Sequence, residues 1–186
     1  MHVPLPTGGG VGEVEVVRPR RDLGIDPVWF STPTPIDFPS EGGRTAHALW
    51  YPPTAPGIEG LEGERPPAIV FIHGGPTSSA RAMLSLATQF WTSRGFGVVD
   101  VNYGGSTGYG RPYRELLKPT WGIVDVQDCA AAVRWLAEQG LADGERLAIR
   151  GGSAGGFTTL AALITTDVFA VGASLYGVTD LAALAK

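Results

Sequence analysis

The sequence has few of the residues that form disulfides or bind metals. Its 186 residues include one cysteine, Cys129, and three histidines, His2, His47 and His73. A single cysteine excludes an internal disulfide and favours the reducing cytoplasm as the compartment. The histidines are too scattered along the chain to offer the spacing of metal ligands. We therefore expect neither a metal nor another cofactor.

An excess of positive charge is also absent, as is any long apolar run. Lys and Arg together number 14 against 18 Asp and Glu, for a net charge of −4. This balance gives no basic surface for nucleic acid. No apolar stretch approaches the ~20 residues that span a membrane. The first residues also lack the positive start and apolar run of a signal peptide. We expect no nucleic-acid partner, no membrane and a cytoplasmic location.

The composition is that of an ordinary globular domain. Apolar residues make up 44% of the chain and charged residues 17%, which is typical of proteins with a packed core. Residues 1–27 are rich in Gly, Pro and Arg and show no sustained periodicity, so they are predicted to form a tail or linker. Residues 28–186 are predicted to form the folded domain, which is an ordinary length for one domain.

The pattern over residues 28–186 alternates between strands and helices. Two extended runs around "SEGG" predict a hairpin whose proline-containing strand lies at a sheet edge. Four short apolar runs predict strands buried on both faces: 68–72, 96–101, 146–149 and 170–176. Helical spacing follows three of them: 80–94 with Ser78 or Ser79 as N-cap, 124–139, and 154–165, with a short helix over 112–118. Such alternation predicts an α/β fold with a doubly wound, mostly parallel sheet.

One glycine-rich turn carries the strongest chemical signal. The segment from Gly151 to Gly155 fits G-x-S-x-G between a predicted strand and a predicted helix. A sharp turn there needs neighbours almost without side chains, which Gly151, Gly152, Gly155 and Gly156 provide. We predict that Ser153 is a nucleophile and that the amide of Ala154 stabilises an oxyanion. The alternative is that the serine only caps the helix. A phosphate loop or dinucleotide fingerprint does not fit this spacing.

A second loop predicts the other half of an oxyanion hole. In "FIHGGP" a strand ends at His73, Gly74 and Gly75. Glycines let the backbone approach a substrate carbonyl closely, so the Gly75 amide is the candidate second donor, with Gly74 beside it. His73 is expected to brace the loop by hydrogen bonding. The alternative is an ordinary histidine at a strand end.

Four segments together resemble one family. "FIHGGP", "NYGGSTGYG", "WGIVDVQDCAAAVRWLAEQG" and "IRGGSAGG" occur in the order and spacing of the catalytic domain of the prolyl oligopeptidase family. The resemblance is greatest to its acylaminoacyl-peptidase-like and dipeptidyl-aminopeptidase-like branch, and covers roughly residues 28–186. It implies an α/β-hydrolase fold that cleaves short peptides through an acyl-enzyme. Ser153 matches the nucleophile, and Gly75 and Ala154 match the oxyanion amides.

The same resemblance gives expectations for neighbouring residues. Tyr103 is expected to support the site. Gly104 stands where members often have an arginine, so local bracing or substrate contacts are expected to differ. Full-length members carry a β-propeller before this domain, and residues 1–27 could be the end of that connection.

The sequence after Ser153 lacks the expected base and acid of a catalytic triad. In this fold the acid and then the histidine follow the serine, but no histidine follows Ser153. Asp167 and Asp180 are the later acids, and Asp180 is expected to cap a following helix. We expect a hydrolase domain incomplete at its C-terminus and inactive alone. An unpaired sheet edge would favour a complementary C-terminal segment or self-association. Alternatives are an esterase or lipase, or a non-catalytic fragment that needs a complementary chain.

Overall fold

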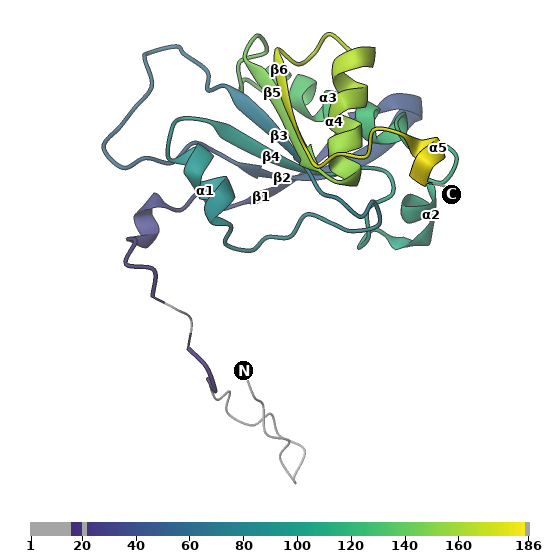
Figure 1. The fold of residues 1–186 in the computed structure, drawn as a ribbon. Helices are drawn as coiled ribbons and strands as arrows, with labels where there is room; N and C mark the ends of the chain where they lie inside the picture. The colour runs from purple at the N-terminus through teal and green to yellow at the C-terminus, as the bar shows by residue number, and fades with distance from the viewer. Residues whose placement is uncertain (1–15, 20–21, 185–186) are drawn as a thin grey trace.

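The computed structural model describes residues 16–19 and 22–184 (Figure 1). Most of the predicted tail over residues 1–27 lies outside these residues. After a short 3-10 turn at Pro27–Trp29, the strands are β1 (Thr34–Ser40), β2 (Arg44–Tyr51), β3 (Ala68–Ile72), β4 (Gly97–Asn102), β5 (Leu147–Gly152) and β6 (Val171–Leu175). The helices are α1 (Leu86–Thr92), α2 (Gly110–Glu115), α3 (Val124–Glu138), α4 (Ala154–Thr165) and α5 (Leu181–Leu184).

The strands form one six-stranded sheet in the order β1-β2-β4-β3-β5-β6. β1 and β2 pair antiparallel as the predicted hairpin, and β2 pairs antiparallel with β4. β4, β3, β5 and β6 are parallel. The predicted doubly wound, mostly parallel sheet is therefore confirmed. The order reverses between β3 and β5, and ligands of open α/β sheets bind at the carboxyl ends of the strands beside such a reversal.

Helices α3 and α4 pack on one face of the sheet, whereas α1 packs on the other (Figure 1). Strand residues facing α3 and α4 form the core: Val70, Val99 and Val101 are fully buried, and Ile149 is almost so. Apolar spacing over 124–139 places Val126, Cys129, Ala130, Val133, Leu136 and Ala137 on one side of a helix, and in α3 all of these except Ala137 are buried. Burial raises the pKa of the Cys129 thiol, so this cysteine fills space in the core rather than ionising.

The predicted start of the helix over 80–94 is wrong. Helix α1 begins at Leu86, and the Ser85 hydroxyl caps it by accepting a bond from the Thr88 amide at 3.3 Å. The preceding segment instead runs as a loop across the carboxyl ends of β3 and β4. The carbonyl of Ser78, one of the predicted N-caps, accepts from the Thr107 amide at 2.7 Å, so a tertiary bond occupies an acceptor that the first turn of a helix would use. The amide of Ala80 donates to the Asn102 side-chain oxygen at 2.8 Å and also holds this segment as a loop.

No helix in the described part of the chain is long and apolar enough to cross a membrane. Within the same residues, no group of three or more His, Cys, Asp or Glu side chains is arranged to hold a metal ion.

Candidate active site

Ser153 occupies a strained turn between β5 and α4. Its backbone has φ 55° and ψ −121°, a region that residues with a Cβ rarely adopt. Three hydrogen bonds impose it: the Ser153 amide donates to the Leu175 carbonyl at 3.1 Å, and the Ser153 carbonyl accepts from the amides of Phe157 and Val178, both at 3.2 Å. The side chain is exposed, and its hydroxyl makes no bond that caps α4. Capping therefore does not account for this serine.

The glycines around Ser153 leave no room for side chains. A Cβ on Gly151 would lie 2.4 Å from the Gly155 carbonyl oxygen, and one on Gly155 would lie 2.5 Å from that of Ile72. A Cβ on Gly156 would meet the Gly177 backbone at 2.6 Å, and one on Gly152 would meet the Tyr176 hydroxyl at 2.8 Å. The contacts at Gly151, Gly155 and Gly156 are with backbone atoms, so these three positions require glycine, whereas the exposed Tyr176 side chain can move away from a Cβ on Gly152.

The loop after β3 passes directly beside the serine. A Cβ built on Gly74 would lie 3.4 Å from Ser153 Cβ and 3.9 Å from its Oγ. Gly75 has φ 130°, which favours glycine. The two loops meet because β3 and β5 are parallel neighbours, with Ile72 opposite Gly151. Ala154 is the first residue of α4 and is buried, so its amide lies at the positive end of the helix dipole.

His73 and Tyr103 hold the loop after β3 in place. The His73 ring stacks on the Tyr103 ring with centroids 4.4 Å apart. His73 Nε2 lies 2.8 Å from the Ser106 hydroxyl, and Nδ1 lies 3.0 Å from the Gly74 carbonyl oxygen. The Tyr103 hydroxyl lies within hydrogen-bonding distance of the carbonyls of His73 and Pro76. Burial lowers the pKa of His73, which favours a neutral ring that donates from Nδ1 to the Gly74 carbonyl and accepts at Nε2 from the Ser106 hydroxyl.

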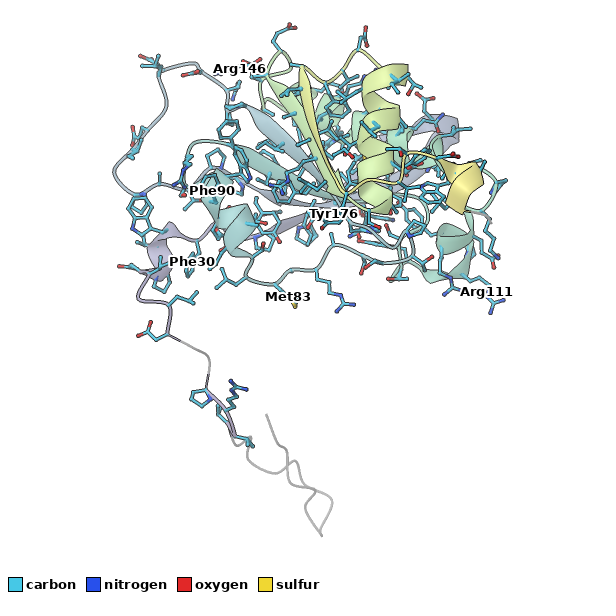
Figure 2. All side chains as sticks on the ribbon, viewed as in Figure 1. Phe30, Met83, Phe90, Arg111, Arg146 and Tyr176 are labelled. Carbon is cyan, nitrogen blue, oxygen red and sulfur yellow. The ribbon has the colours of Figure 1, made fainter. Side chains whose placement is uncertain are left out.

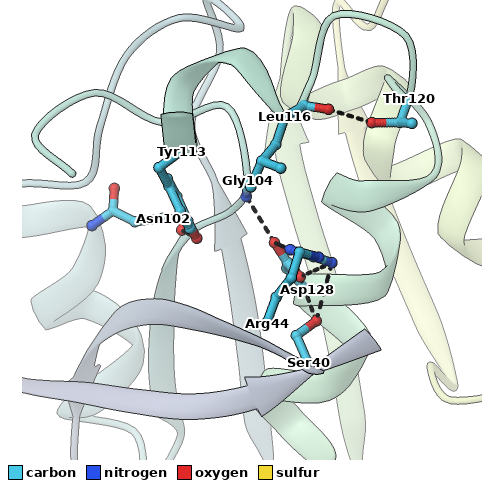
Figure 3. A network of polar contacts seen from close by, with 8 residues as sticks. All are labelled: Ser40, Arg44, Asn102, Gly104, Tyr113, Leu116, Thr120 and Asp128. Carbon is cyan, nitrogen blue, oxygen red and sulfur yellow. Dashed lines mark hydrogen bonds and ion pairs between the residues drawn. The ribbon is translucent and has the colours of Figure 1, made fainter. Parts of the chain in front are cut away.

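A buried carboxylate that the sequence reasoning missed ties the hairpin to the loop after β4 (Figure 3). Asp128 of α3 is fully buried. Its oxygens accept from the Gly104 amide at 2.7 Å, from the Arg44 guanidinium at 2.9 and 3.1 Å, and from the Ser40 hydroxyl. Gly104 thus serves as a backbone donor, and a Cβ there would lie 2.8 Å from Val124. The sequence contained a signal for this residue, because Asp128 is a charged residue on the buried side of the helix predicted over 124–139.

A second buried carboxylate connects α3 to the helix after the serine. Asp125 accepts from the Thr158 hydroxyl of α4 and from the Gly122 amide, the latter at 2.7 Å. Its pKa is raised by burial. The neighbouring Trp121 ring meets the Phe157 ring edge-on, with centroids 5.2 Å apart. Asp125 therefore links the loop before α3 to α4.

The described residues do not bring a base to Ser153. His73 contacts Ser106 and Gly74 instead. His47 belongs to the hairpin, where its Nδ1 lies 2.6 Å from an Asp37 oxygen and its ring stacks on Tyr109 at 4.0 Å. His2 lies outside the described residues. Asp180 accepts from the Ala182 amide at 2.9 Å at the start of α5, as its expected capping role requires, and Asp167 is exposed on a loop.

The strain at Ser153 leads to a prediction about stability. Glycine adopts positive φ freely, so Ser153→Gly should raise the free energy of unfolding by about 1 kcal/mol. Ser153→Ala keeps the Cβ and should leave the strain in place. Urea unfolding of both variants measures the difference. A glycine variant no more stable than the alanine variant would show that this backbone stores no strain.

This arrangement of sheet, serine turn and glycine loop is that of the α/β-hydrolase fold, and comparison with known proteins gives the family. Residues 82–186 match the model of the prolyl oligopeptidase family. Dipeptidyl aminopeptidase BIII of Pseudoxanthomonas mexicana is 31% identical over 150 residues, which cover 79% of this chain and 22% of that protein. Acylamino-acid-releasing enzyme of Arabidopsis thaliana is 39% identical over 97 residues, covering 52% and 13%. The chain belongs to the prolyl oligopeptidase family of peptidases, as the sequence motifs predict.

Solved structures agree with this assignment. A puromycin-hydrolyzing peptidase of Mycobacterium tuberculosis superposes with a TM-score of 0.91 at 49% identity, covering 98% of this chain and 28% of that one. A puromycin hydrolase superposes with a TM-score of 0.86 at 53% identity, covering 89% and 25%. The chain thus spans about a quarter of the length of these structures.

Proposed function

We propose that this chain carries the nucleophile and the oxyanion hole of a serine peptidase that cleaves short peptides through an acyl-enzyme. The observation that supports the proposal most directly is Ser153 itself. Its hydroxyl is exposed at the carboxyl end of the sheet, takes no part in capping α4 and lies beside the glycine loop after β3. The peptidase names of the relatives favour a peptide over an ester substrate. Ester hydrolysis by the same groups is the second candidate.

In the proposed reaction, the Ser153 oxygen attacks the carbonyl carbon of the scissile bond while a base takes its proton. The amides of Ala154 and Gly75 donate to the oxygen that becomes negative. The base then returns the proton to the leaving amine, and water hydrolyses the acyl-serine. Loss of one oxyanion donor costs about 10²–10³ in rate. The bracing of the loop by His73 and Tyr103 therefore bears directly on catalysis.

We further propose that the chain alone is inactive or very weak. No histidine among the described residues contacts Ser153, and the base would come from a complementary C-terminal segment. An oxyanion hole without a complete triad still supplies roughly 10³–10⁴ over water. Ser153 should therefore react slowly, limited by the absence of a proton acceptor.

Chemical rescue by an external base tests this proposal on the chain itself. Intact-mass detection would follow the labelling of the purified chain by a fluorophosphonate, with and without added imidazole. Neutral imidazole can take the place of the missing base, so it should accelerate labelling of the chain and leave Ser153→Ala unlabelled. The Ala variant controls for other hydroxyls.

Two results would contradict the proposal. Labelling that survives in Ser153→Ala would show that Ser153 is not the nucleophile. Rapid labelling without imidazole would show that the chain already holds a base, and so overturn its proposed inactivity. If imidazole accelerates labelling as expected, peptide and ester substrates added under the same conditions would distinguish a peptidase from an esterase.

A further inference from the structure

The Gly75 amide of the proposed oxyanion hole shares a peptide unit with the carbonyl that His73 contacts. This unit joins Gly74 to Gly75 and is trans. In a trans unit the C=O and the N–H point in opposite directions. Neither glycine carries a Cβ, so the unit can rotate at little steric cost. Whatever holds the Gly74 carbonyl therefore decides where the Gly75 amide points.

The groups that contact the His73 ring lie on one side of β3, and the serine lies on the other. β3 stands between β4 and β5 in the sheet. Tyr103 and Ser106, which contact the ring, belong to the loop after β4. Ser153 follows β5, and Tyr176, labelled in Figure 2, follows the next strand, β6. The ring is therefore on the β4 side of the loop after β3, opposite Ser153.

The Gly74 carbonyl consequently points toward β4 and the Gly75 amide toward β5. His73 Nδ1 lies 3.0 Å from the Gly74 carbonyl oxygen. On the other side, a Cβ on Gly74 would lie 3.9 Å from Ser153 Oγ. The Gly75 amide donates to no other group among the described residues, so it is available to an oxygen atom bound beside Ser153.

The contacts of the His73 ring select one of its two neutral tautomers. Nδ1 faces the Gly74 carbonyl oxygen and, 3.3 Å away, the Tyr103 hydroxyl oxygen. The proton of that hydroxyl has acceptors of its own in the carbonyls of His73 and Pro76, so the hydroxyl oxygen can accept from Nδ1. We infer that Nδ1 carries the ring proton and Nε2 a lone pair.

Ser106 supplies the donor that this tautomer needs. Its side chain is fully buried, and its hydroxyl lies 2.8 Å from His73 Nε2, with no other hydrogen-bond partner in the described part of the chain. If Nε2 carried the proton, the hydroxyl would have to accept, and its own proton would be buried without an acceptor, which is unfavourable. That tautomer would also direct a lone pair from Nδ1 at Gly74. It would favour a rotated peptide unit whose Gly75 amide donates to the ring instead of to a substrate.

We propose that Ser106 and His73 are positioning residues of the oxyanion hole. Ser106 fixes the tautomer of His73, and the tautomer fixes the direction in which the Gly75 amide points. This positioning role rests on the proposed function, because it concerns the same oxyanion. Both side chains act through one peptide unit, and within the described residues neither forms a hydrogen bond with Ser153.

Fluorophosphonate labelling of Ser153 in the presence of imidazole measures the effect, because the phosphoryl oxygen of the reagent takes the place of the oxyanion. Ser106→Ala should lower the labelling rate constant roughly tenfold, the size of one hydrogen bond between neutral groups, with little change in the reagent concentration that gives half the maximal rate. Thr107→Ala is the matched control, because Thr107 belongs to the same loop and its side chain forms no hydrogen bond within the described residues. Thermal unfolding shows whether each variant is folded.

Two substitutions of His73 separate its two nitrogens. Asparagine places an amide nitrogen near the position of Nδ1, whereas glutamine places one near the position of Nε2. His73→Asn should therefore lower the rate by less than about tenfold, and His73→Gln by about 10²-fold, the usual effect of losing one oxyanion donor. In the His73→Asn chain, Ser106→Ala should cause no further loss, because the group through which Ser106 acts is gone.

The nitrogen chemical shifts of the His73 ring report the tautomer without reference to activity, and the chain has only three histidines to assign. The wild type should carry the proton on Nδ1, and Ser106→Ala should show a mixture of tautomers. A proton on Nε2 in the wild type, undiminished labelling of Ser106→Ala, or an equal effect of Thr107→Ala would each overturn the positioning role alone. A wild-type chain whose labelling imidazole does not accelerate would contradict the proposed function, and the positioning role with it.

Discussion

Asp128→Ala is expected to lower the free energy of unfolding by about 3–5 kcal/mol, the usual effect of removing one partner of a buried ion pair. Asp128 is fully buried and is the common acceptor for the Arg44 guanidinium, the Gly104 amide and the Ser40 hydroxyl. Without it, the Gly104 amide loses its acceptor and Arg44 is left partly buried without a counter-charge. Urea unfolding followed by circular dichroism measures the loss.

Two further variants separate charge from position in this network. Asp128→Asn keeps an acceptor for the Gly104 amide but removes the charge that faces Arg44. It should therefore lose less stability, about 1–3 kcal/mol. Glu138→Ala, at an exposed position on the same helix, should change stability by no more than about 0.5 kcal/mol. A tolerated Asp128→Ala would mean that the hairpin and the loop after β4 hold their places without this carboxylate.

Gly155→Ala is expected to destabilise the protein by about 3 kcal/mol or more, at the upper end of overpacking effects. Alanine favours a helix over glycine by about 1 kcal/mol, and Gly155 lies in the first turn of α4. The added Cβ, however, would lie 2.5 Å from the Ile72 carbonyl oxygen. That atom belongs to the backbone of a central strand and cannot move aside, so the steric effect exceeds the helical preference.

Gly144→Ala provides the matched control. A Cβ on Gly144 would be 3.5 Å from Ala137 Cβ, which is an ordinary contact. The free energy of unfolding of Gly144→Ala should therefore differ from that of the wild type by no more than about 0.5 kcal/mol. Thermal unfolding of both variants makes the comparison. Similar stabilities for the two would show that α4 can withdraw from β3 without loss. In that case the glycines would not be required by packing.

Sequence patterns predicted the sheet well because its strands are short, continuous apolar runs separated by helical spacing. The hairpin, the parallel strands and the buried side of α3 follow from such local periodicity. The start of α1 did not follow. Met83 and Leu84 have helical spacing, yet they lie in a loop before α1 and are exposed. Tertiary bonds hold that loop: the Ser78 carbonyl accepts from the Thr107 amide, and the Ala80 amide donates to the Asn102 side chain at the end of β4. Apolar spacing alone could not reveal bonds to distant segments.

The sequence by itself determined the strands and the family, through glycines around one serine and a glycine loop after an earlier strand, and it contains no histidine after Ser153. Only the tertiary structure decided which distant groups meet. It brings Gly74 beside Ser153 through the parallel pairing of β3 and β5, and it joins Arg44, Gly104 and Asp128. The physical reason is that local periodicity reports burial along one segment. Hydrogen bonds and close backbone contacts between segments depend on strand order and register, which no single segment encodes.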